Sequence, residues 1–289
     1  MNHTHVPSRR QMLRTAAATA AVIPLWALAA DAPPPVGKPA DPWRGLHVGA
    51  ASYSFRKLPL DAAIKAIQRV DLHYVSIKDF HLPMNSTREQ RQDVAKKFRD
   101  AGITPISCGV ISTKNDENDV RRAFEYARDI GVPTIVGMPD PKSMPLLDKY
   151  VKEFDIKLAI HNHGPESKEW KSPYDAWEAV KDHDPRIGLC IDVGHTARAG
   201  VDPAEAIRKC KDRLYDLHMK DVGNLRGKNA GSEVEVGRGA LDIRAMLQAL
   251  LDIRYQGHVG FEHEKDATDP LPGVAESVGY MKGVLSQMR

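Results

Sequence analysis

The sequence predicts an α/β fold, a single-domain (β/α)8 TIM barrel, and three observations lead to this fold class. Short apolar runs rich in Val and Ile alternate with amphipathic stretches of helical period, which is the pattern of parallel strands joined by crossover helices. The alternation occurs eight times, and eight such units over about 245 residues match the usual size of this barrel. An open doubly wound sheet is the alternative, but the first strand–helix turn lacks the Gly-x-Gly-x-x-Gly phosphate loop of that fold.

The barrel is expected over residues 44–289. Its strands are predicted, in chain order, at residues 47–54, 74–79, 105–110, 134–137, 157–161, 187–192, 214–220 and 258–262. A helix is predicted after each strand, at residues 60–70, 87–101, 115–130, 143–154, 174–181, 203–211, 242–251 and 274–286. Gly102 and Gly131 directly follow the second and third of these helices, where a glycine commonly ends a helix.

Residues 1–30 are predicted to be an export signal. Arg9 and Arg10 precede a weakly apolar stretch with an Ala-Leu-Ala site that ends at Ala29, and no acidic residue occurs in this segment. The segment resembles a twin-arginine signal, with Met12 where that pattern usually has Phe, which implies the twin-arginine export machinery and a periplasmic protein. A Sec signal or a membrane anchor is the alternative. An apolar run of about 16 residues, interrupted by Pro24, is short for a span, so no stable membrane span is expected after cleavage.

The rest of the chain is formally neutral. Residues 31–43 are Pro-rich and are expected to form an extended linker. Beyond the signal, 38 Lys and Arg residues balance 38 Asp and Glu residues, without the basic excess of a duplex-binding protein, so no nucleic-acid partner is expected. The three cysteines include no Cys-x-x-Cys pair, which leaves thiolate zinc sites without support.

Four polar residues stand at the ends of four successive predicted strands, and they suit a divalent metal ion: His161, Asp192, His218 and Glu262. The active site of such a barrel lies at the carboxyl ends of its strands. Neutral imidazoles with carboxylates suit Mn²⁺, which is favoured here, or Zn²⁺, Co²⁺ or Fe²⁺, and four protein ligands leave two octahedral positions for substrate oxygens. A single histidine would usually be structural, but the joint placement favours a metal site.

Further polar residues are expected beside this metal. Lys78 and Lys220 end the second and seventh strands, where an ammonium group would stabilise a developing enolate, although an ion pair with a neighbouring aspartate explains each equally well. His163 and Glu264 lie two positions beyond ligand candidates, and His195 follows Asp192 by three. We expect His163 in proton transfer, and four residues in substrate binding: His81, His195, Glu264 and Trp170.

Several motifs together resemble a known family: Asp192-x-x-His195 after an apolar strand, His218-x-Lys220-Asp221, Gly237-x-Gly239, and Tyr255-x-Gly257-x-x-Gly260-x-Glu262. In this order they are similar to the xylose-isomerase-like barrel superfamily of sugar isomerases and epimerases, which includes tagatose-type epimerases, inosose dehydratases and endonuclease IV. The resemblance implies metal ligation by Asp192, His218 and Glu262. His161 departs from the pattern, because the family often has a glutamate at this strand end.

The resemblance implies a sugar isomerase or epimerase. The predicted export signal and the absence of a phosphate-binding loop favour a small, unphosphorylated sugar or keto-sugar as its substrate. The metal would hold an enediolate after removal of the α-proton by Glu262, with Lys78, Lys220 and His163 as further acid/base candidates. The substitution at His161 puts a simple two-glutamate epimerisation in doubt. Lyase or dehydratase chemistry on a keto-sugar or glycoside, a non-catalytic periplasmic sugar-binding protein and an endonuclease are the alternatives, of which the neutral charge disfavours the last. Family habit also implies a homo-oligomer.

Overall fold

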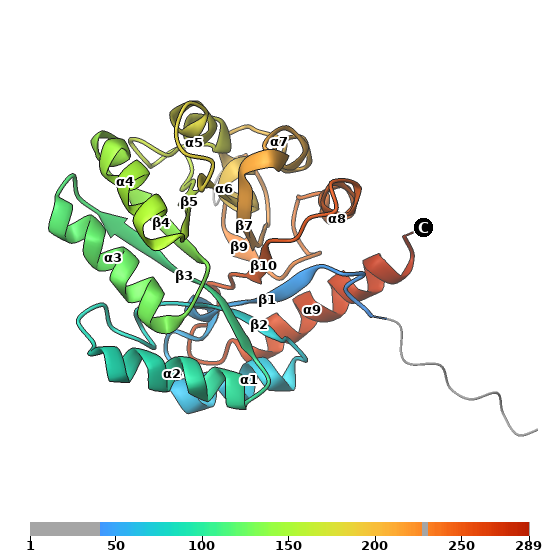
Figure 1. Cartoon of the computed structure of the whole chain (residues 1–289). Helices are drawn as coiled ribbons and strands as arrows, with labels where there is room; N and C mark the ends of the chain where they lie inside the picture. Colours follow the sequence, from blue (N-terminus) through green and yellow to red (C-terminus); the bar gives the residue numbers. More distant parts are fainter. Residues whose placement is uncertain (1–40, 227–230, 289) are drawn as a thin grey trace, which may run out of the picture. The chain divides into compact units, whose positions relative to one another are not determined.

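The computed structural model describes residues 41–226 and 231–288, and these form the barrel that the sequence predicts. Eight parallel strands close on themselves in the order β1-β10-β7-β6-β5-β4-β3-β2, with the helices on the outside (Figure 1). The predicted export signal and most of the predicted linker lie outside the described residues. Trp43, at the end of that linker, is already buried in the core.

The barrel strands agree with the predicted ones to within a few residues: β1 (His47–Ala51), β2 (Tyr74–Ile77), β3 (Thr104–Thr113), β4 (Thr134–Pro139), β5 (Lys157–His161), β6 (Ile187–Asp192), β7 (Leu214–Met219) and β10 (His258–Phe261). The largest difference is β3, which continues to Thr113 through an irregularity in its pairing with β4. Two short strands after β7 were not predicted, β8 (Asp221–Val222) and β9 (Glu233–Val234), and they form an antiparallel pair.

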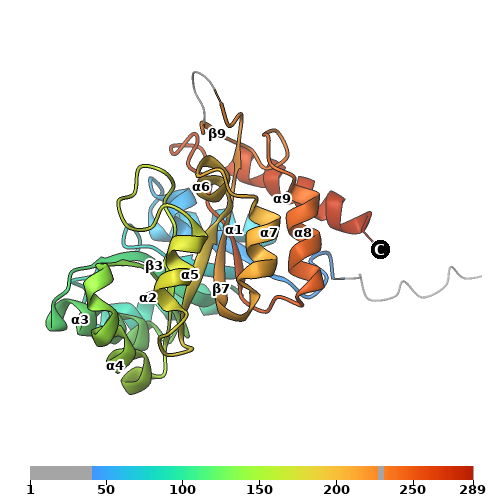
Figure 2. The same cartoon turned by 90° about the horizontal axis from the view of Figure 1, so that it is seen from above.

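The outer helices, seen from above in Figure 2, cover the barrel strands. They are α1 (Leu60–Arg69), α2 (Arg88–Asp100), α3 (Glu117–Ile130), α4 (Met144–Phe154), α5 (Pro173–Val180), α6 (Val193–Arg198), α7 (Pro203–Lys209), α8 (Ile243–Asp252) and α9 (Leu271–Ser286). Only α6 has no predicted counterpart. This short helix begins directly at the end of β6. The side chain of Asp192 caps it by accepting the backbone N–H of His195. None of the described helices is both long and apolar enough to cross a membrane.

Local signals fix where the helices begin and end. Thr87 and Gln90 form a reciprocal capping box at the start of α2, in which each side chain accepts the other residue's backbone N–H. The Asp116 side chain caps α3, and Gly131 ends that helix in the left-handed conformation at φ 80°. These signals set the start of α2 and both ends of α3, and so the lengths of the crossovers that these two helices form.

The barrel contains two kinds of interior surface. Apolar side chains fill the space between helices and strands in one continuous core. Inside the barrel, Val136, Ala159 and Cys190 form a small separate apolar cluster. Ala159 and Cys190 each lie two residues before His161 and Asp192 on the same strand, and therefore on the same strand face. The apolar layer thus forms a floor beneath a polar layer at the carboxyl ends of the strands.

Candidate active site and metal centre

Four buried side chains meet at the carboxyl ends of four neighbouring strands, as the sequence predicts. His161 ends β5, Asp192 ends β6, His218 lies in β7, and Glu262 directly follows β10. The register pairs Asp192 with His218 across the β6–β7 ladder. One nitrogen or oxygen from each of the four residues lies within 4.8 Å of those of the other three. This spacing is consistent with a shared divalent ion.

The polar atoms of this cluster lack the partners that burial normally requires. The Nε2 atom of His161 lies 3.5 Å from Oδ2 of Asp192, and Nδ1 of His218 lies 3.1 Å from Oε2 of Glu262. Among the described residues, neither ring nitrogen of His161 has a hydrogen-bond partner, and the same holds for Nε2 of His218. Oδ2 of Asp192 also makes no hydrogen bond, although it forms an ion pair with Lys220. Leaving buried polar atoms unbonded is costly. A divalent ion bound by these atoms would satisfy them, so the residues fit a metal.

The protonation states of His161 and Asp192 also fit metal binding, whereas Cys190 and Glu262 outweigh burial and raise the pKa of His218, whose ring must release a proton when a metal binds. Burial lowers the pKa of His161 to about 4, so its imidazole is neutral and has a free lone pair near neutral pH. Burial opposes the ionisation of Asp192, but the charges of His195 and Lys220 outweigh it and hold the pKa of Asp192 well below its usual value. The cluster therefore offers a neutral imidazole beside an ionised carboxylate.

Lys220 supplies the positive charge that balances this cluster. Its Nζ atom lies 3.1 Å from Oδ2 of Asp192, 2.9 Å from Oε2 of Glu262 and 2.7 Å from Oε1 of Glu264. Burial disfavours the ammonium, yet these carboxylates raise the pKa of Lys220 well above its usual value. The ion pair with Asp221 that the sequence left open is not among its interactions, because Asp221 instead accepts backbone N–H groups, including those of Gly237 and Gly239.

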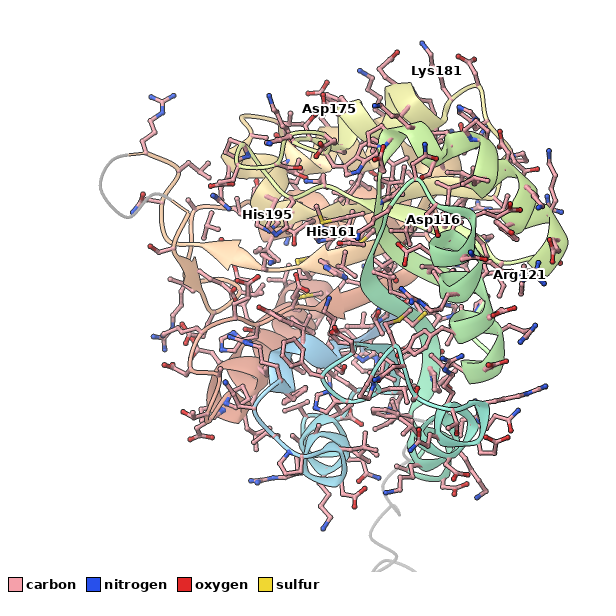
Figure 3. The ribbon with its side chains drawn as sticks, turned by 90° about the vertical axis from the view of Figure 1, so that its left-hand side faces the viewer. Asp116, Arg121, His161, Asp175, Lys181 and His195 are labelled. Carbon is pink, nitrogen blue, oxygen red and sulfur yellow. The ribbon has the colours of Figure 1, made fainter. Side chains whose placement is uncertain are left out.

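A cavity of about 510 Å³ opens beside the cluster at this end of the barrel. It is lined by Tyr53, Lys78, Val110, Ser112, Met138, His161, His163, Glu166, His195, Arg198, Glu262 and Glu264. The His161 and His195 side chains, labelled in Figure 3, have ring centres 6.0 Å apart. A pocket of this size accommodates a small ligand such as a sugar.

Most of the other predicted site residues lie on the wall of this cavity. Lys78 donates a hydrogen bond from Nζ to the Val110 carbonyl oxygen at 2.7 Å, and burial lowers the pKa of Lys78. His163 and His195 pack with ring centres 4.5 Å apart, and burial lowers the pKa of His163. Glu264 also faces the cavity. Lys78, His163, His195 and Glu264 therefore surround the volume in which a ligand of the metal would sit.

The profile of the xylose isomerase-like TIM barrel family matches residues 64–284. The chain belongs to this family. The match covers seven of the eight barrel strands and all four residues of the candidate metal cluster. Family membership therefore agrees with the fold and with a buried His/Asp/Glu metal site at the strand ends.

Curated relatives in the family match only part of this chain. An inosose dehydratase from Clostridium botulinum (strain Eklund 17B / Type B) is 23% identical over 151 residues, which are 47% of this chain and 50% of that protein. The rhizopine catabolism protein MocC from Rhizobium meliloti is 28% identical over 147 residues, 46% of this chain and 45% of that protein. The chain thus spans about half the length of the curated relatives it matches.

Several solved structures share the fold over most of this chain. The IOLI protein, whose structure holds a zinc atom, has a TM-score of 0.69 at 18% identity, and the match covers 84% of this chain and 99% of that one. An L-ribulose 3-epimerase has a TM-score of 0.66 at 17% identity, covering 83% and 95%. A 3-keto-D-glucoside 4-epimerase from E. coli has a TM-score of 0.66 at 15% identity, covering 82% and 99%. These likenesses establish the barrel.

Two predicted substrate-binding residues lie elsewhere among the described residues. His81 is buried, with Nδ1 3.1 Å from Oγ of Ser52 and Nε2 3.2 Å from the Leu58 carbonyl oxygen. Trp170 is buried and donates its indole N–H to the Pro139 carbonyl oxygen at 2.9 Å. Neither residue is part of the cavity wall. The polar ring atoms of His81 and Trp170 therefore have partners within the protein, and these contacts account for the positions of both side chains without a ligand.

Sequence reasoning missed residues that position the predicted ones. Asn162 accepts the backbone N–H of Asp192 at 3.0 Å and donates to Oγ1 of Thr196 at 3.1 Å, which fixes the end of β6 against β5. Arg198 lies 3.0 Å from Nδ1 of His195 and also pairs with Glu166. The three-residue spacing from His195 to Arg198 would have placed both on one helix face, but α6 was not predicted. Nothing in the sequence around Glu166 indicates its place on the cavity.

Proposed function

We propose that this protein is a divalent-metal-dependent enzyme that removes the proton next to the carbonyl group of a small sugar or keto-sugar, as an isomerase or epimerase. One observation carries the proposal. Ligand atoms of His161, Asp192, His218 and Glu262 converge at the strand ends of a barrel, those of the first three include buried atoms without hydrogen-bond partners, and the cluster lies directly beside a cavity large enough for a sugar. A site that only stabilised the fold would not leave buried ligand atoms without hydrogen-bond partners beside a cavity.

The four residues would hold the ion, which when bound supplies positive charge that polarises a sugar carbonyl. Glu262 is the proposed base, because it is ionised, borders the cavity and hydrogen-bonds His218. Lys220 keeps Glu262 ionised and would stabilise negative charge on the substrate. Lys78 and His163, whose pKa values are lowered by burial, are proposed to return the proton at a neighbouring position.

The charges of the cavity favour an uncharged substrate. Its two long cationic side chains, Lys78 and Arg198, already have partners in the Val110 carbonyl oxygen and the Glu166 carboxylate. Glu262 and Glu264 add negative charge on the same wall. A phosphate group would therefore meet repulsion and no free cation, whereas sugar hydroxyl groups would find many acceptors.

Dehydration is the second candidate reaction, and one residue outside the predicted set favours it. Burial raises the pKa of Glu233 to about 8, so this carboxyl group is largely protonated near neutral pH. Its Oε1 atom accepts the backbone N–H of Glu264 at 2.6 Å, at the edge of the site. A neutral carboxylic acid can donate a proton to a departing hydroxyl group. The matching relatives named inosose dehydratase add support for this class.

Metal analysis beside a proton-exchange assay tests the proposal. We expect about one divalent ion per chain in the purified protein, loss of that ion in H218A and E262A, and exchange of the α-proton of a keto-sugar in heavy water by the wild type but by neither of these two variants. Isomerised, epimerised or dehydrated product then identifies the reaction. K65Q, on the exposed side of α1, is the control that should keep both properties. Metal and sugar binding without exchange would instead identify a sugar-binding protein.

Export to the periplasm is a separate proposal that rests on Arg9, Arg10 and the apolar stretch up to Ala29. Replacing both arginines by lysine is expected to retain the protein in the cytoplasm, as cell fractionation would show. Unchanged export after this substitution would contradict the twin-arginine route.

A further inference from the structure

Three side chains that take no part in the proposed reaction form a connected row on the wall of the cavity beside the metal cluster. Nη1 of Arg198 lies 3.0 Å from Nδ1 of His195, and Nη2 of Arg198 pairs with Oε1 of Glu166. All three residues line the cavity of about 510 Å³. One guanidinium group therefore links a carboxylate to an imidazole at the place where a substrate would lie.

The backbone holds this row from two sides. His195 and Arg198 stand three residues apart in α6, so their side chains lie on one face of the helix, and Oδ1 of Asp192 accepts the backbone N–H of His195 at 2.8 Å. On the other side lies Gly164, at φ 85°. A Cβ atom at Gly164 would come within 3.2 Å of Oε2 of Glu166 and 3.3 Å of Nδ1 of His195. A glycine adopts this conformation without strain and leaves room for the row.

The contact with Arg198 determines which nitrogen of His195 carries the proton. A guanidinium group has N–H donors and no acceptor, so Nδ1 of His195 accepts the hydrogen bond with its lone pair. The ring proton then lies on Nε2. His195 carries the positive charge that acts on Asp192 only at acid pH, where Nδ1 also binds a proton and this hydrogen bond is lost.

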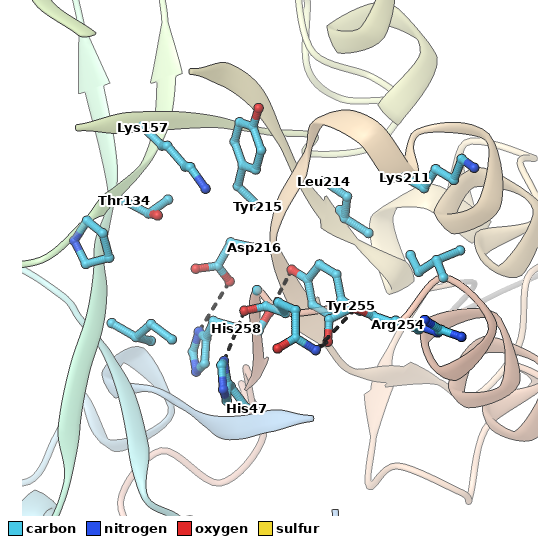
Figure 4. A pocket seen from close by; sticks show the side chains of 15 residues that line it. His47, Thr134, Lys157, Lys211, Leu214, Tyr215, Asp216, Arg254, Tyr255 and His258 are labelled. Atoms are coloured by element: carbon cyan, nitrogen blue, oxygen red, sulfur yellow. Dashed lines mark hydrogen bonds and ion pairs between the residues drawn. The ribbon is translucent and has the colours of Figure 1, made fainter. Parts of the chain in front are cut away.

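The Nε2 atom of His195 is accessible to a ligand. Among the described residues it has no hydrogen-bond partner, and it is not one of the buried atoms in that condition. His258, beside the cavity of about 370 Å³ at the amino-terminal end of the barrel, differs in this respect (Figure 4). Its ring is buried against Asp216, with Nδ1 3.3 Å from Oδ1, and a ligand does not reach it. His195 instead offers an N–H group on the wall of an open cavity.

We propose that Arg198, held by Glu166, is a positioning residue that keeps His195 as an Nε2–H donor to an oxygen atom of the substrate. This role rests on the proposed function, because the donor would stabilise the negative charge that develops on that oxygen when the α-proton is removed. With its Nδ1 lone pair committed to Arg198, His195 is a hydrogen-bond donor and not the base. The neutral donor adds no charge to the cavity, which suits the carbonyl oxygen of an uncharged sugar.

Nitrogen NMR of the histidine rings in the full-length protein tests this role, because the spectrum shows which ring nitrogen carries the proton. R198M removes the guanidinium group, and R198K restores a cationic donor. E166Q is a second variant, which weakens the hold on Arg198 without touching His195. R208M is the matched control, since Arg208 also pairs with an acidic residue, Asp252, but belongs to α7 and is not part of the cavity wall. H195Q identifies the signals of His195.

Near neutral pH we expect a single His195 tautomer, with the proton on Nε2, in the wild type, R208M and R198K. R198M should show a mixture of the two tautomers, and E166Q a smaller change in the same direction. A proton on Nδ1 in the wild type would overturn the proposal, and so would a wild-type spectrum in R198M. The measurement is made in a chelator, so it requires neither metal nor turnover.

The α-proton exchange assay with a keto-sugar, D-fructose, gives the second readout. R198M should lower kcat about tenfold or more and change KM less, because the hydrogen bond strengthens as negative charge develops, and R198K should recover part of the loss. An effect on KM alone would overturn the role of His195 in stabilising that charge. A wild type with the expected tautomer and without exchange would contradict the proposed function, while the tautomers would still support the positioning role of Arg198.

Discussion

Lys220 compensates the negative charge of the carboxylates in the candidate metal cluster. Replacing Lys220 tests whether a bound metal ion compensates the same carboxylates. The K220M variant keeps a side chain of similar length and removes the ammonium. In the metal-free protein the carboxylates of Asp192 and Glu262 then lose the cation that lies 3.1 and 2.9 Å away. With metal bound, the ion takes over much of this compensation. We therefore expect K220M to be strongly destabilising without metal and much less so with it.

The magnitude follows from burial. Lys220 is 4% exposed, and breaking a buried ion pair by removing one partner costs about 3–5 kcal/mol, because an uncompensated charge remains. For a domain of this size, each kcal/mol shifts the melting temperature by about 2–4 °C, so the loss should be about 10 °C. Lys78 is the matched control, since its Nζ donates to the Val110 carbonyl oxygen and K78M leaves no carboxylate of the metal cluster unpaired.

Thermal unfolding of wild type, K220M and K78M measures both effects, once in a chelator and once with excess Mn²⁺ or Zn²⁺. Metal should recover at least half of the stability lost in K220M and should leave the difference between K78M and wild type unchanged. An equal loss for K220M in both conditions would refute the reasoning, because it would show that metal and ammonium do not compensate the same carboxylates.

Three further predictions concern single contacts. N162A removes the acceptor of the Asp192 N–H and should weaken metal affinity about 10- to 100-fold, as measured by competition with a chelator. The far-UV circular dichroism of the variant should change little. An unchanged metal affinity would contradict a positioning role for Asn162. The pKa of His161 is about 4 in the folded chain against 6.5 normally, so metal-free stability should fall by about 3 kcal/mol as the pH drops from 6.5 toward 4, because the unfolded chain takes up the proton first. Urea unfolding measures this loss, and H161Q should lack that part of it. S107A leaves a buried oxygen of Asp216 without its donor and should cost about 1–3 kcal/mol in the same assay, and an unchanged stability would show that this buried carboxylate does not depend on the Ser107 hydroxyl group.

The sequence predicted the fold because the barrel repeats one local pattern eight times. Each strand is an apolar run and each helix has its own periodicity, and both signals are local. The sequence predicted the metal cluster for a related reason: in a closed parallel barrel all strands end at the same rim, so His161, Asp192, His218 and Glu262 had to converge once the strand ends were assigned. The elements missed, α6 and the β8–β9 pair, are short and depend on tertiary contacts.

The sequence by itself therefore determined the barrel, the end at which the site lies and the four candidate ligands. Only the tertiary structure decided which polar residues reach the cavity. His81 and Trp170 point to backbone carbonyl groups, and Lys220 turns to Asp192 and Glu262 rather than to its neighbour Asp221. The position of a residue in its strand fixes the location of its Cα atom. The direction of its side chain and its partner depend on which hydrogen-bond acceptors and charged groups other strands bring close to it.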